Sequence, residues 1–225
     1  MINFIKALYH WSRIRKDKPV DRPKRLFKIV NLFGTKRYMK TRDKFLSNPD
    51  TAALLERDKT LSVLMSNYTK FKRYKKGTLG KEIYEFMQSE EVDYAKLIAD
   101  FGGFTDGYDA RERDIHDIIH VVFGYSRSRF GEGATIATHY WQGNSFGIAF
   151  AVFMGIARQM LIQPLAARLM YTAIRDVYKR QKGINFHAYP FEDNLTKDIN
   201  IIRYELKIPS KTLAIQTVDR LSKWD

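Results

Sequence analysis

Residues 111–132 read RERDIHDIIHVVFGYSRSRFGE, and this stretch carries the clearest structural signal in the chain. Its apolar residues recur at helical spacing and predict an amphipathic helix over 109–123 whose buried face carries Ile115, Ile118, Ile119, Val122 and Phe123. Gly124 follows as a C-terminal stop, because glycine readily adopts the left-handed backbone conformation that ends many helices. The stretch therefore predicts a half-buried helix, a short connection and the start of a second helix.

The same periodicity recurs on both sides of this stretch. It predicts further helices over 61–73, 79–87, 132–161 and 164–181. Pro164 opens the last of these, as an early helical proline does, and Asp193 is predicted to cap a helix that carries Leu195, Ile199, Ile202 and Leu206. Only residues 184–189 look extended. The sequence thus predicts an all-α fold.

Length and composition bound the architecture and exclude several classes of protein. The 225 residues are 44% hydrophobic, enough for one domain with a sizeable core, to which we assign residues 25–225, with residues 1–24 as an appended arm. The absence of cysteine excludes disulfides, zinc fingers, iron–sulfur clusters and thiol nucleophiles. The longest apolar run, 146–157, is shorter than the roughly 20 residues that a membrane span needs, so no integral membrane protein is expected.

Positive charge is concentrated in the first third of the chain. Residues 1–81 hold 22 Lys and Arg against 6 Asp and Glu, whereas residues 82–225 hold 17 against 19. Such an asymmetry indicates an anionic partner, either nucleic acid or an acidic membrane surface.

The first sixteen residues, MINFIKALYHWSRIRK, contain no acidic side chain. Five apolar residues share one helical face: Met1, Phe4, Ile5, Leu8 and Trp11. A basic amphipathic helix with aromatic residues on its apolar side is typical of segments that lie in a membrane interface. The alternative is an arm that packs on the domain with its charges in solvent.

The predicted helix over 109–123 also carries candidate metal ligands. At 100° per residue, His116 and His120 lie 40° apart, and Asp117 lies within the same 100° arc. Glu132, across the connection that begins at Gly124, is a further oxygen donor. Two imidazoles and two carboxylates suit zinc or iron(II) and accept manganese or magnesium less selectively, and we take zinc as the preferred ion. The alternative is a pair of surface histidines beside a solvated carboxylate.

The spacing His116-Asp117-x-x-His120, eleven residues and then Glu132 resembles the signature of the coenzyme Q biosynthesis protein four family. GTLGKEIYEF (77–86) is similar to an upstream segment of that family, and FEDNLTKDINIIRYELKIP (191–209) to its C-terminal helix. The resemblance covers about residues 25–210. It implies an α-helical fold and a divalent metal at His116, Asp117, His120 and Glu132.

The resemblance also implies a function and a location. The family serves ubiquinone assembly, either by organising lipid-modifying enzymes or by oxidative decarboxylation at C1 of a polyprenylated benzoate ring. The implied partners are a polyprenyl lipid or quinone precursor, an anionic membrane surface, other quinone-biosynthesis enzymes and further copies of the chain. The implied location is peripheral to the inner membrane, on the cytoplasmic side, or on the matrix side of a mitochondrion.

Small residues at four-residue steps follow Glu132: Gly143, Gly147, Ala151 and Gly155, with Phe150 and Met154 beside them. Such a stripe either lets a second helix approach closely or leaves a trough for an isoprenoid tail. If it is a trough, these six residues would bind the lipid tail from a metal-held headgroup. Arg127 and Arg129 would then reach a phosphate or carboxylate headgroup; otherwise they are solvated loop residues.

Three other functions remain open at this point. A His-Asp-type metal phosphohydrolase would also contain the His116-Asp117 pair, but it needs an upstream histidine in the same bundle, and only His10 precedes the pair. A nucleic-acid-binding protein would account for the positive charge, although no recognised motif accompanies it. A scaffold with a purely structural metal would have the same ligands.

Overall fold

The computed structural model describes residues 2–14, 16, 22–33, 35–100, 107–143, 146–181, 183–208 and 216, and within these residues the protein is helical with no β-strand. The all-α prediction is confirmed. The helices, in chain order, are α1 (Ile2–Arg13), α2 (Arg22–Leu32), α3 (Lys36–Ser47), α4 (Pro49–Ala52), α5 (Leu61–Ser66), η2 (Tyr68–Arg73), α6 (Leu79–Ser89), α7 (Tyr94–Asp100), α8 (Gly107–Phe123), α9 (Arg129–Trp141), α10 (Phe146–Ile162), α11 (Pro164–Gln181), η3 (Phe191–Asp193) and α12 (Ile199–Glu205). Among the described helices, none combines the length and the apolar character needed to cross a membrane.

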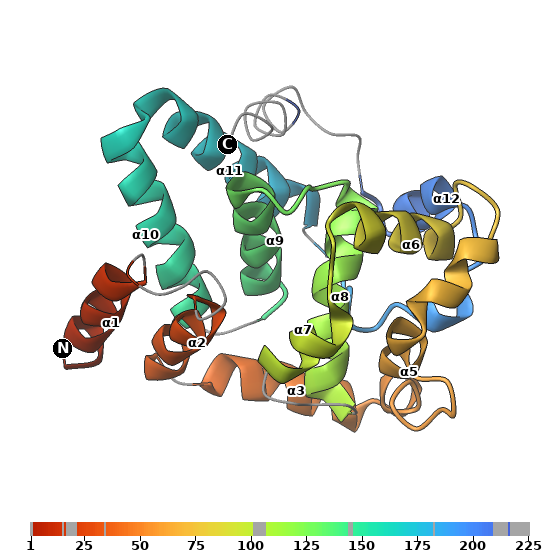
Figure 1. Cartoon of the computed structure of the whole chain (residues 1–225). Coiled ribbons are helices and arrows are strands. Elements are labelled where there is room, and N and C mark those ends of the chain that lie inside the picture. Colours follow the sequence, from red (N-terminus) through yellow and green to blue (C-terminus); the bar gives the residue numbers. More distant parts are fainter. Residues whose placement is uncertain are drawn as a thin grey trace.

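Helix α8 runs through the middle of the molecule (Figure 1) and packs against α5, α6, α9 and α12. Its predicted apolar face is fully buried: Ile115, Ile118, Ile119 and Val122 have no exposed surface. Gly124 ends the helix with a φ of +69°, and the amide of Tyr125 donates to the carbonyl of His120 at 2.8 Å. The predicted helix and its glycine stop are both confirmed.

Buried polar contacts tie other elements to α8. The carboxylate of Asp114, which is fully buried, accepts hydrogen bonds from Ser62 of α5 at 2.5 Å, from Tyr94 of α7 at 2.7 Å and from the adjacent Arg113 at 2.9 Å. A buried carboxylate costs free energy unless it is hydrogen-bonded, so this network fixes where α5 and α7 dock on α8.

One buried arginine holds the segment 183–193 against α8. Arg111 donates from Nε to the carbonyl of His187 at 2.9 Å and from Nη2 to that of Tyr189 at 2.8 Å, and it pairs with the buried carboxylate of Glu192. Residues 186–188 form a turn within the segment 184–189 that the sequence predicted to be extended, and the amide of Tyr189 donates back to the carbonyl of Phe186.

The single helix predicted over 132–161 is wrong, since the chain forms α9 and α10 with a break after Trp141. Gly143 has a φ of +109°, which no helix accommodates, and a Cβ there would lie 2.2 Å from the hydroxyl of Thr41 on α3. The break therefore depends on glycine both for its backbone angle and for the close approach of α3.

Two other predicted boundaries differ. Asp193 lies in η3, and the N-cap of the last described helix is Asp198, whose side chain accepts from the amide of Asn200 at 2.7 Å. The intervening turn docks on α6, where Gly80 donates to the carbonyl of Leu195 at 2.8 Å. The predicted helix over 61–73 divides at Asn67 into α5 and η2. By contrast, the helices at 79–87 and at Pro164 are confirmed.

The helix predicted within the first sixteen residues is confirmed as α1 (Ile2–Arg13), which packs on its neighbours through one side. Helix α1 packs on α2, which packs on α10, and the three helices share a small core of Ala7, Ile29 and Phe150. On the outer side, Ile2, Phe4, Ile5 and Leu8 stay exposed, at 37–68%. Met1 lies outside the described residues. The arm is thus attached to the domain with much of its apolar face in solvent.

Candidate metal centre

Helices α8 and α9 bring His116, His120 and Glu132 together. The Nε2 atoms of the two imidazoles lie 3.4 Å apart, and Glu132 Oε2 lies 3.3 Å from that of His116 and 3.7 Å from that of His120. These three donor atoms form one of two groups, among the described residues, that could hold a metal ion. Glu132 reaches the pair because Ser128 caps α9 by accepting from the amide of Gly131, which starts the helix directly after the connection.

The hydrogen bonds of His120 aim its Nε2 lone pair at the centre of this group. Its Nδ1 lies 3.2 Å from the carbonyl oxygen of Tyr125. A carbonyl only accepts, so the Nδ1 proton is donated there and Nε2 is left as a lone pair. The ring is fully buried and stacks on Phe86 at 5.3 Å. Ligand histidines are commonly oriented in this way, with the other ring nitrogen bound to a carbonyl or carboxylate, so the residues fit a divalent ion.

The protonation states also suit metal binding. Burial lowers the pKa of His116 to about 4, despite the opposing effect of Glu132, so the ring is neutral at pH 7. Burial alone would raise the pKa of Glu132, but its contact with His116 and the proximity of the His120 imidazole outweigh that effect and hold the pKa well below its usual range. His116 is therefore a neutral imidazole and Glu132 a carboxylate, the forms that bind a metal.

Asp117 lies beside this group rather than within it. It is not one of the three residues whose donor atoms lie within 4.8 Å of one another. Its side chain is buried and Oδ2 has no hydrogen-bond partner. Burial, together with the negative charges of Asp114 and Glu132, raises the pKa of Asp117 to about 7. Burying a carboxylate whose oxygen lacks a hydrogen-bond partner costs free energy, and a nearby cation would offset that cost.

We therefore expect Asp117→Asn to stabilise the metal-free protein at high pH. A carboxyl pKa raised from about 4 to about 7 favours the folded state below pH 4, and this advantage is lost as pH rises through 7. Asparagine does not ionise, so the variant avoids this loss of folding free energy. The loss amounts to at most about 1.4 kcal/mol for each pKa unit. Urea unfolding with a chelator at pH 5 and pH 8 measures this. An equal difference between variant and wild type at both pH values would contradict it.

The two predicted headgroup arginines lie close to the same centre in sequence, but only one side chain is described. Arg127 Nε lies 3.4 Å from Glu132 Oε1, and the arginine is partly exposed. The side chain of Arg129 lies outside the described residues. Arg127 is thus positioned beside the carboxylate that faces both histidines.

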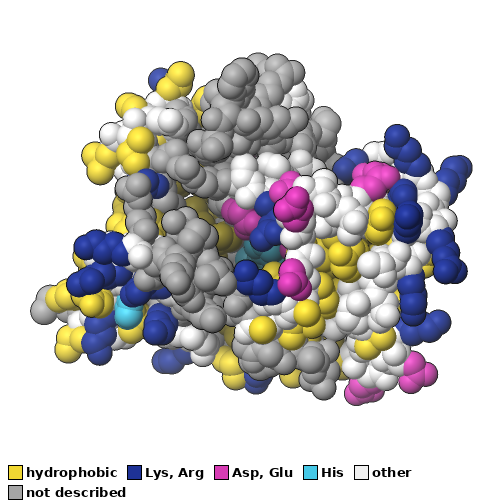
Figure 2. Space-filling model, in the orientation of Figure 1, with side chains coloured by type: hydrophobic (Ala, Val, Ile, Leu, Met, Phe, Trp, Pro, Cys, Tyr) yellow, Lys and Arg dark blue, Asp and Glu magenta, His cyan; other side chains and the backbone are white. Residues whose placement is uncertain are grey.

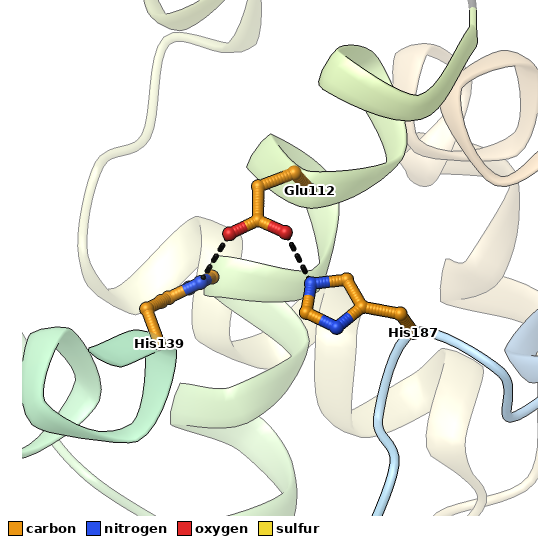
Figure 3. Close-up of side chains that lie close together, drawn as sticks. All are labelled: Glu112, His139 and His187. Atoms are coloured by element: carbon orange, nitrogen blue, oxygen red, sulfur yellow. Dashed lines mark hydrogen bonds and ion pairs between the residues drawn. The ribbon is translucent and has the colours of Figure 1, made fainter. Parts of the chain in front are cut away.

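A second group was not predicted from the sequence. Glu112 on α8 lies between His139 on α9 and His187 in the segment 183–193, which we call the turn segment. Both imidazoles point at the carboxylate of Glu112 (Figure 3). Glu112 is four residues before His116 and His139 seven residues after Glu132, so helical spacing places each on the face of a predicted ligand. No local pattern could have added His187, which is brought in by the contacts of Arg111.

The predicted lipid stripe divides into closed and open parts. Gly143 lies in the break between α9 and α10, and a Cβ on Gly147 would lie 2.3 Å from the backbone of Val30 on α2. Ala151 and Phe150 are buried, and Met154 packs against the small core of Ala7, Ile29 and Phe150. A Cβ on Gly155, in contrast, would meet nothing within 4 Å. The stripe therefore packs against α2 at Gly147, whereas Gly155 at its end faces unfilled space.

Two central helices of this helical protein bring two imidazoles and one carboxylate together. The fold and site therefore define a helical protein with a candidate metal site. The family model for "Coenzyme Q (ubiquinone) biosynthesis protein Coq4" matches residues 21–211, and the chain belongs to this family. A crystal structure of a protein from Nostoc punctiforme PCC 73102, assigned to ubiquinone biosynthesis, resembles the fold with a TM-score of 0.61 at 19% identity, covering 92% of this chain and 99% of that one. Among curated proteins, none matches the chain.

Family membership confirms the resemblance found in the sequence and supports a role in ubiquinone biosynthesis. The structure also bears on the competing phosphohydrolase function. His10, the upstream histidine that a His-Asp phosphohydrolase would need, lies on α1 with its Nδ1 3.4 Å from Arg25 and is not in either histidine group.

Proposed function

We propose that this protein binds a polyprenylated quinone precursor at a membrane surface, with the headgroup at a divalent metal held by His116, His120 and Glu132. The observation that carries the proposal is the convergence of these three donor atoms, with His120 Nδ1 turned away from them and 3.2 Å from the carbonyl oxygen of Tyr125. Zinc suits the donor set best, and iron, manganese or magnesium would also be accepted.

The group is open on one side, as a substrate-binding metal requires. The side chain of His120 is fully buried, whereas those of His116 and Glu132 are 18% and 30% exposed. Figure 2 shows histidine surface in a hollow over α8 and α9, bordered by acidic and basic side chains. A bound ion would act there as a Lewis acid toward a carboxylate or oxygen-rich headgroup. Arg127, at the edge of the group, would pair with a negative headgroup.

Exposure of the metal group on one side is compatible with two forms of the proposed function. In the first, the protein presents the precursor to other quinone-biosynthesis enzymes; in the second, it catalyses oxidative decarboxylation at C1 of the polyprenylated benzoate. In the second form, a two-electron oxidant from solution, such as dioxygen, would supply the oxygen atom that replaces the carboxylate released as carbon dioxide. Release of labelled carbon dioxide from a precursor labelled at the ring carboxylate separates the two, since only the enzyme releases it.

The direct test is to purify the protein and measure its metal content and its extracted lipids by mass spectrometry. The proposal predicts a divalent metal together with a polyprenylated ring compound, and predicts that Glu132→Gln lowers both. Normal lipid content in a metal-free variant would contradict the role of the metal.

The open end of α10 is where the tail would lie. A polyprenyl chain offers a large apolar surface, worth about 0.8 kcal/mol for each CH₂ buried. Around and beyond Gly155, the second half of α10 and the start of α11 expose several large apolar side chains: Phe153, Met160, Leu161, Ile162 and Leu165. Tail contacts are thus expected at Gly155 rather than at Gly147, where α2 already fills the space.

We expect Gly147→Leu and Gly155→Leu to behave differently. The first forces a side chain into Val30 and should destabilise the fold by about 1–3 kcal/mol with or without lipid. The second enters open space and should leave the melting temperature unchanged or slightly higher, since glycine is a poor helix former. It should nevertheless weaken binding of long-chain polyprenyl ligands more than short ones. Thermal melts beside binding measured over a series of chain lengths test this, and length-independent binding would contradict the tail site.

The exposed apolar residues of α1 and of the α10–α11 turn would also enter a membrane interface. Figure 1 shows α1 beside α10 and the turn at the far end of that helix. The outer side of α1 adds exposed basic residues, Lys6 and Arg13. An apolar surface flanked by positive charge is the combination that binds anionic lipid.

We expect the protein to bind anionic vesicles, and deletion of residues 1–16 to weaken the binding. Because that deletion also uncovers Ile29, Ile5→Asp and Leu161→Asp provide milder tests at positions 59% and 88% exposed. Salt should weaken binding too, because a polybasic contribution decays within a Debye length. Tyr204→Asp, at an equally exposed site on α12, is the matched control. Vesicle binding that is unchanged by lipid charge and by all of these substitutions would contradict a membrane-binding surface at α1 and the α10–α11 turn.

A further inference from the structure

The group formed by Glu112, His139 and His187 lies next to the candidate metal centre but is distinct from it. His139 Nδ1 lies 2.9 Å from Glu112 Oε1, and His187 Nε2 contacts Oε2 of the same carboxylate. One donor atom from each residue lies within 4.8 Å of the other two. Figure 3 shows the carboxylate between the two rings, which approach it from opposite sides.

We propose that Glu112, His139 and His187 bind a second divalent transition-metal ion, with zinc the best match. Two imidazoles and one glutamate are the ligands of a well-known type of zinc site in enzymes. The three ligands come from α8, α9 and the turn segment, 27 and 75 residues apart in sequence. An ion at this point would therefore cross-link three elements that the chain brings together only when it folds.

Burial and charge favour a cation at this position. The side chains of Glu112, His139 and His187 are 13%, 7% and 4% exposed. Burying a carboxylate this far from solvent is costly unless it is hydrogen-bonded or paired, and both imidazoles already contact the two oxygens of Glu112. A divalent ion between the carboxylate and the two imidazoles would neutralise the charge using donors that are already in place.

The ligands are held in position by contacts that do not involve the ion. Arg111 binds the backbone carbonyls of His187 and Tyr189, and the ring of Tyr108 stacks on that of His187 at 5.6 Å. Ligands positioned by packing and hydrogen bonds lose little freedom on binding a metal. These contacts thus hold His187 in position without a bound ion.

The second ion would also affect the first centre. The ring of His139 stacks on that of His116 at 5.2 Å with an interplanar angle of 18°. Fixing His139 would therefore fix the position of His116, a ligand of the proposed substrate-binding metal. The second ion would be structural, since its ligands are more buried than His116 and Glu132, and it would support the orientation of the first.

Zinc stoichiometry tests this directly. The purified full chain is stripped of metal, incubated with excess zinc, passed over a desalting column and analysed for bound zinc. Wild type should retain about two equivalents. Glu112→Gln and His187→Gln should each retain about one, His120→Ala about one, and the His120→Ala/His187→Gln double variant none. His10→Ala, at the one histidine outside both groups, should retain two.

Glutamine at 112 and 187 approximately keeps side-chain volume and leaves a polar group at each position, and circular dichroism checks each fold. His139 is left unchanged because it contacts His116. In His120→Ala, zinc should raise the melting temperature, and adding Glu112→Gln should remove that shift. Wild-type zinc content in both Glu112→Gln and His187→Gln would overturn the second site and leave a hydrogen-bonded triad. Loss of zinc in these variants but not in His120→Ala would instead overturn the proposed function.

Discussion

His116→Ala and His120→Ala are each expected to remove the metal at the first centre and to abolish ubiquinone production in a host that lacks its own family member. Each change deletes one of three donors that converge within 3.7 Å. Loss of a residue that merely orients a ligand costs about 10–100-fold in metal affinity, so loss of a ligand should cost more. Elemental analysis and quinone extraction provide the two measurements.

The two variants differ in how much they disturb the fold. His116 is partly exposed, whereas His120 is buried against Phe86, so the alanine at 116 is the cleaner test. Helical circular dichroism should be largely retained in both. Glu132→Gln should show the same loss to a smaller degree, and His10→Ala should show none. Wild-type quinone content in metal-free His116→Ala protein would mean that the metal is dispensable.

Arg111→Ala is expected to destabilise the fold strongly, by about 3–5 kcal/mol. Arg111 is 1% exposed and satisfies two backbone carbonyls and the carboxylate of Glu192, which is itself buried. Removing it leaves an uncompensated charge and two unpaired carbonyls in the interior. The turn segment that carries His187 would lose its attachment to α8.

Equilibrium unfolding in urea measures this loss, and a second arginine provides the comparison. Arg57 pairs with Asp193 at 2.6 Å, but their side chains are 38% and 56% exposed. Surface pairs of this kind contribute about 0–1 kcal/mol, so Arg57→Ala should scarcely change the free energy of unfolding. Similar losses for the two substitutions would show that Arg111 does not anchor the segment.

The central helix and its stop could be predicted because local pattern and burial agree there. The isoleucines that define the apolar face of α8 are all buried, and Gly124 adopts the positive φ that its position suggested. The break at Gly143 could not be predicted from periodicity, because apolar residues continue on both sides of it. What decides the break is the approach of Thr41, about a hundred residues earlier in the chain.

The same distinction applies to the candidate site. His116 and His120 follow from helical spacing, and Glu132 from the family pattern. His139 and Glu112 share faces with these ligands but carry no recognised motif, and His187 depends on the long-range contacts of Arg111. The capping residue Asp198 was missed because Asp193 offers the same local chemistry. Only the docking of the intervening turn on Gly80 distinguishes them.

The binding of a short-chain prenylated hydroxybenzoate to metal-loaded and metal-free protein tests the central claim most directly. Calorimetric titration compares this ligand with an analogue that lacks the ring carboxylate. If the headgroup binds at the metal held by His116, His120 and Glu132, removing the metal should weaken the carboxylate ligand at least about tenfold, or about 1.4 kcal/mol, and leave the analogue unchanged. Equal affinity of the carboxylate ligand for both forms of the protein would contradict the claim.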